Sequence, residues 1–305
     1  MRLLKWLLAL TGVLFLVTAG YWIWQHRSGQ RFPFEKSVPQ ADIWTLQYGP
    51  TTLVFAHRVN DWTVSAGSGA FTADINRVKK ALDNFQALSV EDEISDRADR
   101  ASEFEVDAAS GVRVELMKGP ASLGAVILGK PAPDVGHSYI RFPEMPNVYL
   151  AKGIVRATLF PIDLKNWRSK DLWFLNDDPI VSILIETPSA RTYLLRSSDT
   201  WTCNGEPADK TAAESLASQL HALRADEVVD LPIPADLAPE KLTFARIVVQ
   251  TKSSAHELHL GTRDAKFQRS PAALANDTNI VWLYDYRVNA LLKTPSDFLP
   301  ASPQK

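Results

Sequence analysis

The chain has 305 residues, of which 46% are hydrophobic, 10% aromatic and 22% charged, a composition typical of folded globular protein rather than of disorder. Its 33 basic and 35 acidic residues give a formal net charge of −2. Three of the basic residues and none of the acidic ones fall within 1–27, so the remainder is more acidic still, which excludes the basic face that nucleic acid binding needs. The single cysteine, Cys203, excludes an internal disulfide.

Residues 6–24 predict a membrane anchor. The segment carries no charge, and as a helix rising ~1.5 Å per residue it would extend roughly 28 Å, enough to cross a bilayer. Arg2 and Lys5 precede it, while Trp22 and Trp24 lie at its far end, where an aromatic belt would meet the interface. We therefore expect a single-pass inner-membrane protein with a cytoplasmic N-terminus and a periplasmic bulk. A cleaved signal peptide is the alternative.

Two stretches separated by about 135 residues match each other in order and in kind. The segment 51–64, TTLVFAHRVNDWTV, lies beside 190–203, ARTYLLRSSDTWTC, with Trp62 opposite Trp201. An Ala-Asp pair and a helical pattern follow in both copies. This order predicts an internal duplication into two units of about 120 residues, each large enough to hold a core. Further matches pair VILG (126–129) with LHLG (258–261) and VYL (148–150) with VWL (281–283).

Each unit has the pattern of a strand-rich domain with one principal helix. Strands with alternating polarity surround the tryptophan, which we expect in the core, and Asp74 or Asp209 is placed to cap a helix with apolar residues at spacings of three and four. The expected fold class is therefore α+β, an N-terminal transmembrane helix followed by two tandem homologous units. The predicted helix positions are Ile75, Val78, Leu82, Phe85 and Leu88, then Ala213, Leu216, Leu220 and Leu223, and strands are expected near 112–118, 122–129, 138–142 and 147–151.

The resulting domain organisation has six parts. The segment before the first repeat lacks periodicity and is expected to be a tether, and the segment between the repeats is expected to be a hinge. The predicted parts are a membrane anchor (1–27), a tether (28–40), a first α+β repeat (41–165), a hinge (166–178), a second α+β repeat (179–300) and a tail (301–305).

These residues together resemble a bacterial membrane-anchored family known as domain of unknown function 4340. The resemblance rests on the tryptophan strand and its helix, on LGKPAPDVGHSYIRF (128–142), NVYL (147–150) and NWRSKDL (166–172). It departs at ASEFEVDAASG (101–111), which replaces a Tyr-Gly-Leu turn. The resemblance implies association with ABC-type transport systems and gliding-type auxiliary proteins, and it supplies no catalytic residues. We expect no cofactor, and the chain lacks the clustered ligands that a structural metal site needs.

Residues with reactive side chains are explained by the predicted structure. His256 and His259 lie three apart on an expected strand, so they should point to opposite faces and cannot share a metal. Cys203 matches Val64 of the first copy, so a small buried position explains it better than a nucleophile does. The acidic run of 91–99 lacks the glycine and spacing of a calcium loop and is expected to be a solvated loop.

The sequence favours a non-enzymatic envelope protein, a scaffold or an accessory subunit of an ABC-type transport complex, attached to the membrane through residues 6–24. A periplasmic small-molecule or glycan-binding module is the alternative. A hydrolase ranks third and is disfavoured, because no nucleophile and base are visibly paired. Trp167 and its cationic neighbours could connect the two units or dock a partner. Phe142 belongs with the aromatic residues of the glycan-binding alternative, and the candidate interaction residues are Trp167, Arg168, Lys170, Tyr139, Tyr149 and Trp282.

Overall fold

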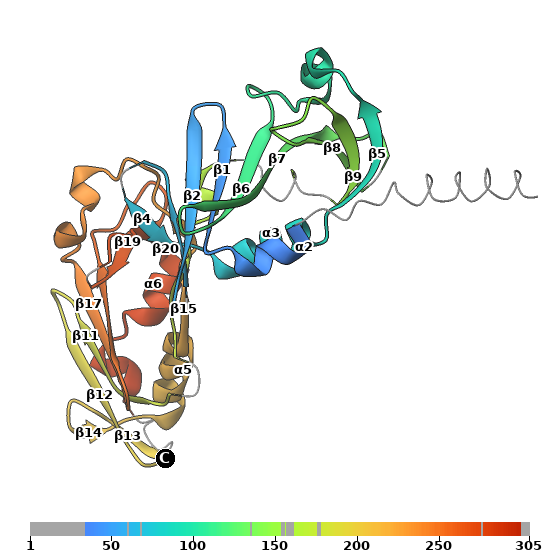
Figure 1. Cartoon of the computed structure of the whole chain (residues 1–305). Helices are drawn as coiled ribbons and strands as arrows, with labels where there is room; N and C mark the ends of the chain where they lie inside the picture. The colour runs from blue at the N-terminus through green and yellow to red at the C-terminus, as the bar shows by residue number, and fades with distance from the viewer. Residues whose placement is uncertain are drawn as a thin grey trace, which may run out of the picture. The chain divides into compact units, whose positions relative to one another are not determined.

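The computed structural model describes residues 34–59, 61–67, 69–134, 136–153, 156, 162–175, 178–275 and 277–299. The chain forms two compact units, Met1–Asn166 and Trp167–Lys305, each of which is described by itself (Figure 1). The anchor predicted over 6–24 lies outside the described residues. Within the described ranges, no helix combines the length and apolar character needed to cross a membrane.

The first unit is built on a nine-stranded antiparallel sheet with the order β4-β3-β2-β1-β6-β7-β8-β9-β5. Helix α3 (Ile75–Gln86) connects β4 to β5, and a 3-10 helix, η2 (Ala98–Phe104), connects β5 to β6. A short helix, α2 (Phe34–Ser37), and η1 (Val38–Gln40) precede the sheet, and η3 (Leu164–Asn166) follows it. The strands are β1 (Ile43–Tyr48), β2 (Thr51–Arg58), β3 (Asp61–Ser65), β4 (Ala70–Thr72), β5 (Ser89–Ser95), β6 (Val112–Lys118), β7 (Ala121–Pro131), β8 (His137–Arg141) and β9 (Val148–Lys152).

The second unit repeats this topology strand for strand, in the order β14-β13-β12-β11-β17-β18-β19-β20-β16. Helix α5 (Lys210–His221) takes the place of α3, and α6 (Asp285–Leu291) and η6 (Pro295–Phe298) are additional. Two short 3-10 helices, η4 (Ala235–Leu237) and η5 (Pro239–Lys241), precede β17. The strands are β11 (Ile180–Glu186), β12 (Arg191–Ser197), β13 (Thr200–Cys203), β14 (Glu206–Pro207), β16 (Glu227–Val228), β17 (Ala245–Thr251), β18 (Ala255–Leu260), β19 (Arg269–Leu274) and β20 (Val281–Tyr284).

The strand registers fix which residues are equivalent in the two units. Trp62 pairs with His57 across β2 and β3, and Trp201 pairs with Arg196 across β12 and β13, so the two tryptophans occupy the same position. Their burial differs. Trp201 is 3% exposed and belongs to the core, whereas Trp62 is only half-buried and its ring lies 5.0 Å from that of His57. The expectation of two core tryptophans is therefore correct for the second unit alone.

The principal helices begin where the sequence predicts. Asp74 accepts hydrogen bonds from the backbone N–H groups of Asn76 and Arg77, and Asp209 accepts one from Ala212, so each aspartate caps its helix. Each helix packs on its sheet through its predicted apolar positions, although Ile75 remains 45% exposed. The buried helix residues are Val78, Ala81 and Phe85 in α3 and Ala213, Leu216 and Leu220 in α5.

Burial alternates along the central strands because successive side chains point to opposite faces of a sheet. In β6 and β17 every second residue is buried against the helical side. The opposite face of each sheet carries a smaller apolar cluster covered by the segment that precedes β6 or β17. In the first unit this cluster contains Phe104, Val106, Ile127 and Val148, and in the second Val229, Leu242, Ile280 and Trp282.

The predicted α+β fold class is wrong. Among the described residues, the longest helix of each unit has twelve residues and accompanies a sheet of nine strands, so both units are predominantly antiparallel β-structure. The transmembrane helix included in that prediction has no counterpart among the described residues. The edge strands β5 and β16 and the short β4 and β14 carry weak alternation, which is why the pattern underestimates the strand content.

The segment expected to be a hinge, 166–178, has regular structure in its described part. Strand β10 (Asp171–Phe174) pairs with β15 (Ala222–Arg224), which follows α5 directly. Trp173 is buried in the core of the second unit and donates its indole N–H to the carbonyl oxygen of Leu220 at 2.6 Å. The segment therefore contributes to the fold of the second unit.

Candidate functional site

Three of the residues singled out from the sequence lie at the start of the second unit. Trp167 is 0% exposed and Arg168 is 2% exposed. The Arg168 guanidinium donates to Asn279 Oδ1 at 3.0 and 2.5 Å and to the carbonyl oxygen of Val229 at 2.6 Å. Lys170 Nζ donates to the carbonyl oxygen of Asp226 at 2.7 Å. These contacts connect the segment to residues that flank strands β16 and β20 of its own unit.

Burial affects the electrostatics of Arg168. Desolvation lowers the pKa of its guanidinium, and the nearby carboxylates of Asp277 and Asp230 oppose that change. Asn279, which accepts two of its hydrogen bonds, also donates to the carbonyl oxygen of Ser169 at 3.2 Å. Because a buried cation is tolerated only when its donors are satisfied, this network fixes the side chain inside the fold.

Two of the aromatic candidates, Tyr139 and Tyr149, point to opposite faces of the first unit's sheet. Tyr139 packs on Phe104 with ring centroids 4.7 Å apart, and Tyr149 lies 5.7 Å from the ring of Phe142, all within the first unit. Trp282 belongs to the second unit. The ladders pair Ile140 with Tyr149 in β8 and β9 and Ala272 with Val281 in β19 and β20, so the match of VYL with VWL is displaced by one residue and Trp282 occupies the position of Leu150. The strand pairings therefore determine which residues of β9 and β20 are equivalent.

Trp282, which is only 9% exposed, forms part of a group of side chains that we call the Arg269 cluster, made of Arg269, Trp282, Phe267, Glu227 and Tyr284. Arg269 Cζ lies 4.0 Å from the centroid of the Trp282 ring and 4.8 Å from that of Phe267, which places the cation between two aromatic faces. Its guanidinium donates to Glu227 at 2.9 Å, and Glu227 also accepts from the hydroxyl of Tyr284 at 2.8 Å. These contacts hold the Arg269 guanidinium from several directions.

A second group of polar contacts continues from this cluster along α6. Asp226 accepts from both Arg287 (3.0 Å to Nη2) and the hydroxyl of Tyr286 (2.5 Å). Burial alone would raise the pKa of Asp226, but the hydrogen bonds from Arg287 and Tyr286 outweigh burial and lower it. The ring of Tyr286 remains 62% exposed, and that of Phe267 is 54% exposed. Exposed aromatic rings held by arginines have the composition of interface hot spots.

A different pair of sites lies on the sheet face opposite the principal helices. In each unit a row of residues crosses β1, β6, β7 and β8, or their equivalents β11, β17, β18 and β19. We call these the arginine rows, because Arg113 and Arg246 occupy the same position in them. The first row is Gln47, Arg113, Ile127 and Arg141, and the second is Glu186, Arg246, His259 and Ala273.

Each arginine row forms part of an open cavity. The first has a volume of about 270 Å³ and is lined by residues that include Arg113, Arg141 and Asp107. The second has a volume of about 350 Å³ and is lined by residues that include Arg246, His259 and Phe244. The sequence analysis missed both arginines, although alignment of VRVELMK (112–118) with ARIVVQT (245–251) would have placed them together.

The two rows differ in their charge. In the second, Arg246 donates to Glu257 at 2.7 and 3.1 Å and to Glu186 at 3.1 Å, contacts that raise the pKa of Arg246 and lower that of Glu257. In the first, Arg113 reaches a carboxylate of Glu115 at 3.3 Å. The positions of Glu186 and Glu257 are held there by Gln47 and Ala125, which carry no charge.

The two histidines considered for metal binding lie on opposite faces of the sheet, and each contacts a side chain near it in sequence. His256 lies 5.6 Å from the ring of Trp173 and 3.0 Å from Ser254 Oγ, whereas His259 contacts Glu257 at 2.8 Å on the other face, as the strand alternation predicts. No described carboxylate contacts the second ring nitrogen of His256, so the Ser254 contact has no third group of a triad. Cys203 is 7% exposed, and burial raises the pKa of its thiol.

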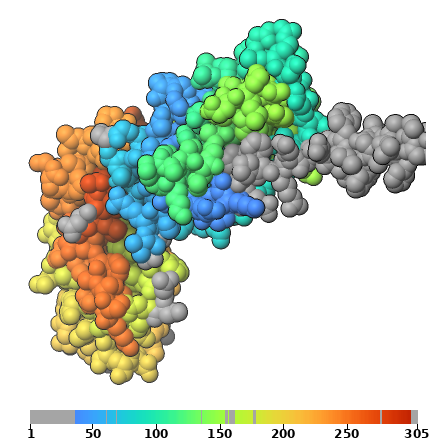
Figure 2. Space-filling view, viewed as in Figure 1, coloured from blue at the N-terminus to red at the C-terminus, as the bar shows by residue number. Residues whose placement is uncertain are grey.

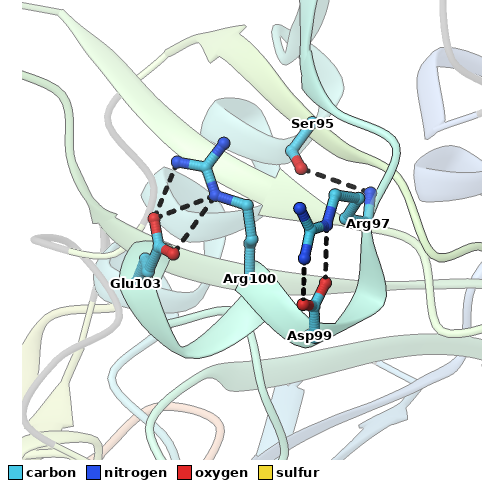
Figure 3. A network of polar contacts seen from close by, with 5 residues as sticks. All are labelled: Ser95, Arg97, Asp99, Arg100 and Glu103. Atoms are coloured by element: carbon cyan, nitrogen blue, oxygen red, sulfur yellow. Dashed lines mark hydrogen bonds and ion pairs between the residues drawn. The ribbon is translucent and has the colours of Figure 1, made fainter.

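The acidic run of 91–99 lies partly in strand β5 and partly in η2. Glu91 lies in β5 and contacts His137 at 2.9 Å, whereas Asp99 lies in η2 and accepts from Arg97 Nε at 3.1 Å. Figure 3 shows Arg97 with Asp99 and Ser95, and beside them the pair of Arg100 and Glu103. In the ranges that the structure describes, no group of three or more potential ligands converges on a metal position. In Figure 2 the η2 segment, drawn in teal, forms a projection on the first unit.

The fold and these sites define a duplicated antiparallel β-protein whose two copies each carry a cavity on the sheet face of the arginine row. A family model described as "Domain of unknown function (DUF4340)" matches residues 62–244, so the chain belongs to this family. The match begins in β3 of the first unit and ends just before β17 of the second. Neither the search of curated proteins nor the search of solved structures gave a match.

Proposed function

We propose that this chain is a non-enzymatic envelope protein and an accessory subunit of an ABC-type transport complex. Its two units are on the periplasmic side of the inner membrane, with which the chain associates through residues 6–24. The uncharged sequence of that segment and the basic residues before it support this location. The choice of a transport complex rests on the association that the family resemblance implies.

One observation carries the proposal that a protein partner docks on the second unit. The Arg269 cluster holds an arginine between two aromatic rings and leaves Phe267 54% exposed, and Tyr286 on α6 of the same unit is 62% exposed. Tryptophan, tyrosine and arginine are enriched among the residues that dominate the binding energy of protein interfaces, where they fill well-packed, desolvated pockets. Glu227 already holds Arg269 and Asp226 already holds Arg287, so binding a partner would restrict these side chains little further.

The experiment is site-specific photocrosslinking in living cells. A photoreactive amino acid replaces Phe267 or Tyr286 in the full chain, and crosslinked products are identified by mass spectrometry. We expect both positions to capture a subunit of a membrane transport complex. The matched control is Tyr193, a 40% exposed aromatic residue of strand β12 in the same unit, which should not capture it.

Two further results would count against the proposal. Capture of the same subunit from Tyr193 would show that the crosslink reports proximity without a defined site. Absence of any transport subunit from both Phe267 and Tyr286, with the variants present at normal levels, would remove the accessory role. A reporter that is active only outside the cytoplasm, fused after Lys305, tests the location: it should be active, and activity of a cytoplasm-only reporter at the same position would contradict a periplasmic location.

The small-molecule alternative has its own observation, which is the cavity on the arginine row of the first unit. It has a volume of about 270 Å³, a size that suits a small solute. The aromatic residues first considered for that role lie elsewhere. Tyr139 packs on Phe104, and Tyr149 packs on Phe142.

A further inference from the structure

The arginine row of the first unit carries charge that its equivalent in the second unit does not. We propose that the cavity of the first unit binds the carboxylate of a small aliphatic acid, with Arg113 and Arg141 as its two cationic contacts. This site is independent of the Arg269 cluster.

Strand register places the two arginines on one face. Ile127 pairs with Arg113 of β6 on one side and with Arg141 of β8 on the other, so the three side chains project in the same direction. Neighbouring strands are about 4.8 Å apart, which puts the two arginine backbones roughly 10 Å from each other. That separation admits one small anion between two guanidinium groups.

The hydrogen bonds already made leave donors available. Arg141 Nε donates to the carbonyl oxygen of Val106 at 2.9 Å and Nη1 to that of Met145 at 3.3 Å, so neutral acceptors orient this guanidinium without cancelling its charge. Arg113 Nη2 makes one long contact to Glu115 at 3.3 Å, and Glu115 also accepts from Ser122 Oγ at 2.8 Å. Among the described residues, Arg141 Nη2 and Arg113 Nη1 therefore keep unused donors, and forked guanidinium donors match a carboxylate.

The remaining lining explains why the ligand should be aliphatic and small. Ile127, Ala108 and Pro143 contribute apolar surface to the cavity. The carboxylate of Asp107 also lies in the lining, but it accepts from its own turn, from the backbone N–H groups of Ala109 and Ser110 at 2.8 and 3.1 Å and from the hydroxyl of Ser110. Those donors lower the pKa of Asp107 and hold its charge toward the turn.

The second unit shows how such a row is neutralised. Glu186 and Glu257 together accept three hydrogen bonds from Arg246, and Ala273 stands where the first unit has Arg141. The duplication has thus produced one row whose single arginine is held by two carboxylates and one in which two arginines meet Asp107 in the lining and one long contact from Glu115. The proposal rests on this difference in charge pairing between equivalent positions of the two units.

The test is isothermal titration of the full chain with pentanoate. We expect one site on the first unit, and we expect Arg113→Ala or Arg141→Ala to weaken binding about tenfold or more, the effect of losing one charge-assisted hydrogen bond. The control is Arg97→Ala, which removes an exposed arginine of the same unit that pairs with Asp99 and should leave binding unchanged.

A second variant keeps both arginines and copies the second row into the first. Gln47→Glu combined with Ala125→Glu should neutralise Arg113 internally and weaken pentanoate binding at least as much, while the melting temperature stays near that of the parent. Retained binding in this variant would overturn the proposal, as would failure of the parent chain to bind pentanoate.

The probe series separates the sources of affinity. Pentanol, which has a similar chain without charge, should not bind; equal binding would show an apolar cavity alone and contradict the carboxylate assignment. Inorganic phosphate and vesicles containing phosphatidylglycerol should bind more weakly than pentanoate at this site. Tighter binding of either one, lost in Arg113→Ala, would show a phosphate site and overturn the assignment. Partner capture from Phe267 should persist in every variant, so failure here leaves the docking proposal intact.

Discussion

Replacement of Arg168 by alanine is the sharpest test of how the second unit is built. The residue is 2% exposed, and its guanidinium donates to Asn279 Oδ1, to the carbonyl oxygen of Val229 and, at 3.3 Å, to that of Ile280. Truncation removes these donors together and leaves their acceptors inside the fold.

The expected cost follows from those acceptors. A buried acceptor left without a donor costs about 1–3 kcal/mol, and loss of one member of a buried charged network typically costs about 3–5 kcal/mol. Desolvation lowers the pKa of Arg168, which shows that burying the cation is itself costly. Removing the cation recovers that cost and offsets part of the stability lost with its hydrogen bonds. We therefore expect Arg168→Ala to destabilise the second unit by about 4 kcal/mol.

Equilibrium urea unfolding of the full chain measures this change. The transition of the second unit should move to lower urea, whereas Lys170→Ala, which removes one hydrogen bond to the Asp226 carbonyl, should move it by about 1 kcal/mol. The double variant Arg168→Ala with Asn279→Ala should cost less than the sum of its parts, because the two side chains share their hydrogen bonds. An Arg168→Ala variant that unfolds like the parent would refute the reasoning.

Three further predictions follow from other contacts. Arg246 holds the pKa of Glu257 below its ordinary value, so this pair stabilises the fold above the unfolded-state pKa and the contribution is lost as pH falls through the folded-state pKa. The difference in stability between the parent and Glu257→Gln should therefore shrink as unfolding is measured at more acidic pH. Gly129→Ala would place a Cβ 2.3 Å from the backbone oxygen of Phe104, whereas Gly261→Ala meets the Leu242 side chain at 2.7 Å, so thermal unfolding should show the larger loss for Gly129, about 1–3 kcal/mol. Trp201→Ala should cost about 3–5 kcal/mol and Trp62→Ala less, because only Trp201 is in a core; equal losses by denaturant titration would contradict the difference in burial.

The repeat is the part of the fold that the sequence predicts best. The equivalence of Trp62 with Trp201 reappears in the strand registers, because aromatic residues and turns on paired strands leave a pattern that survives divergence. The helix starts at Asp74 and Asp209 are also correct, since an N-cap is a local interaction. Fold class was wrong because β14 and β16 have two residues each, too few to show alternation.

The candidate sites depend on contacts that sequence spacing does not encode. Arg168 was expected to connect the two units or to dock a partner, yet Asn279 and the Val229 carbonyl, both far away in sequence, hold it buried inside the second unit. The one-residue displacement of Trp282 from the position of Tyr149 is visible only in the ladders. Arg113 and Arg246 could have been found from the sequence by extending the repeat alignment over β6 and β17, but the acids that distinguish them lie on neighbouring strands.

The central claim is that the two copies of one sheet have diverged, with a cationic row left available in the first and neutralised in the second. The most direct measurement is the side-chain Nε–Hε NMR spectrum of the ¹⁵N-arginine-labelled full chain, titrated with pentanoate and assigned by single arginine variants. The account predicts that the resonances of Arg113 and Arg141 shift together and saturate while that of Arg246 stays in place. A shift of Arg246 with Arg113 unmoved would contradict it.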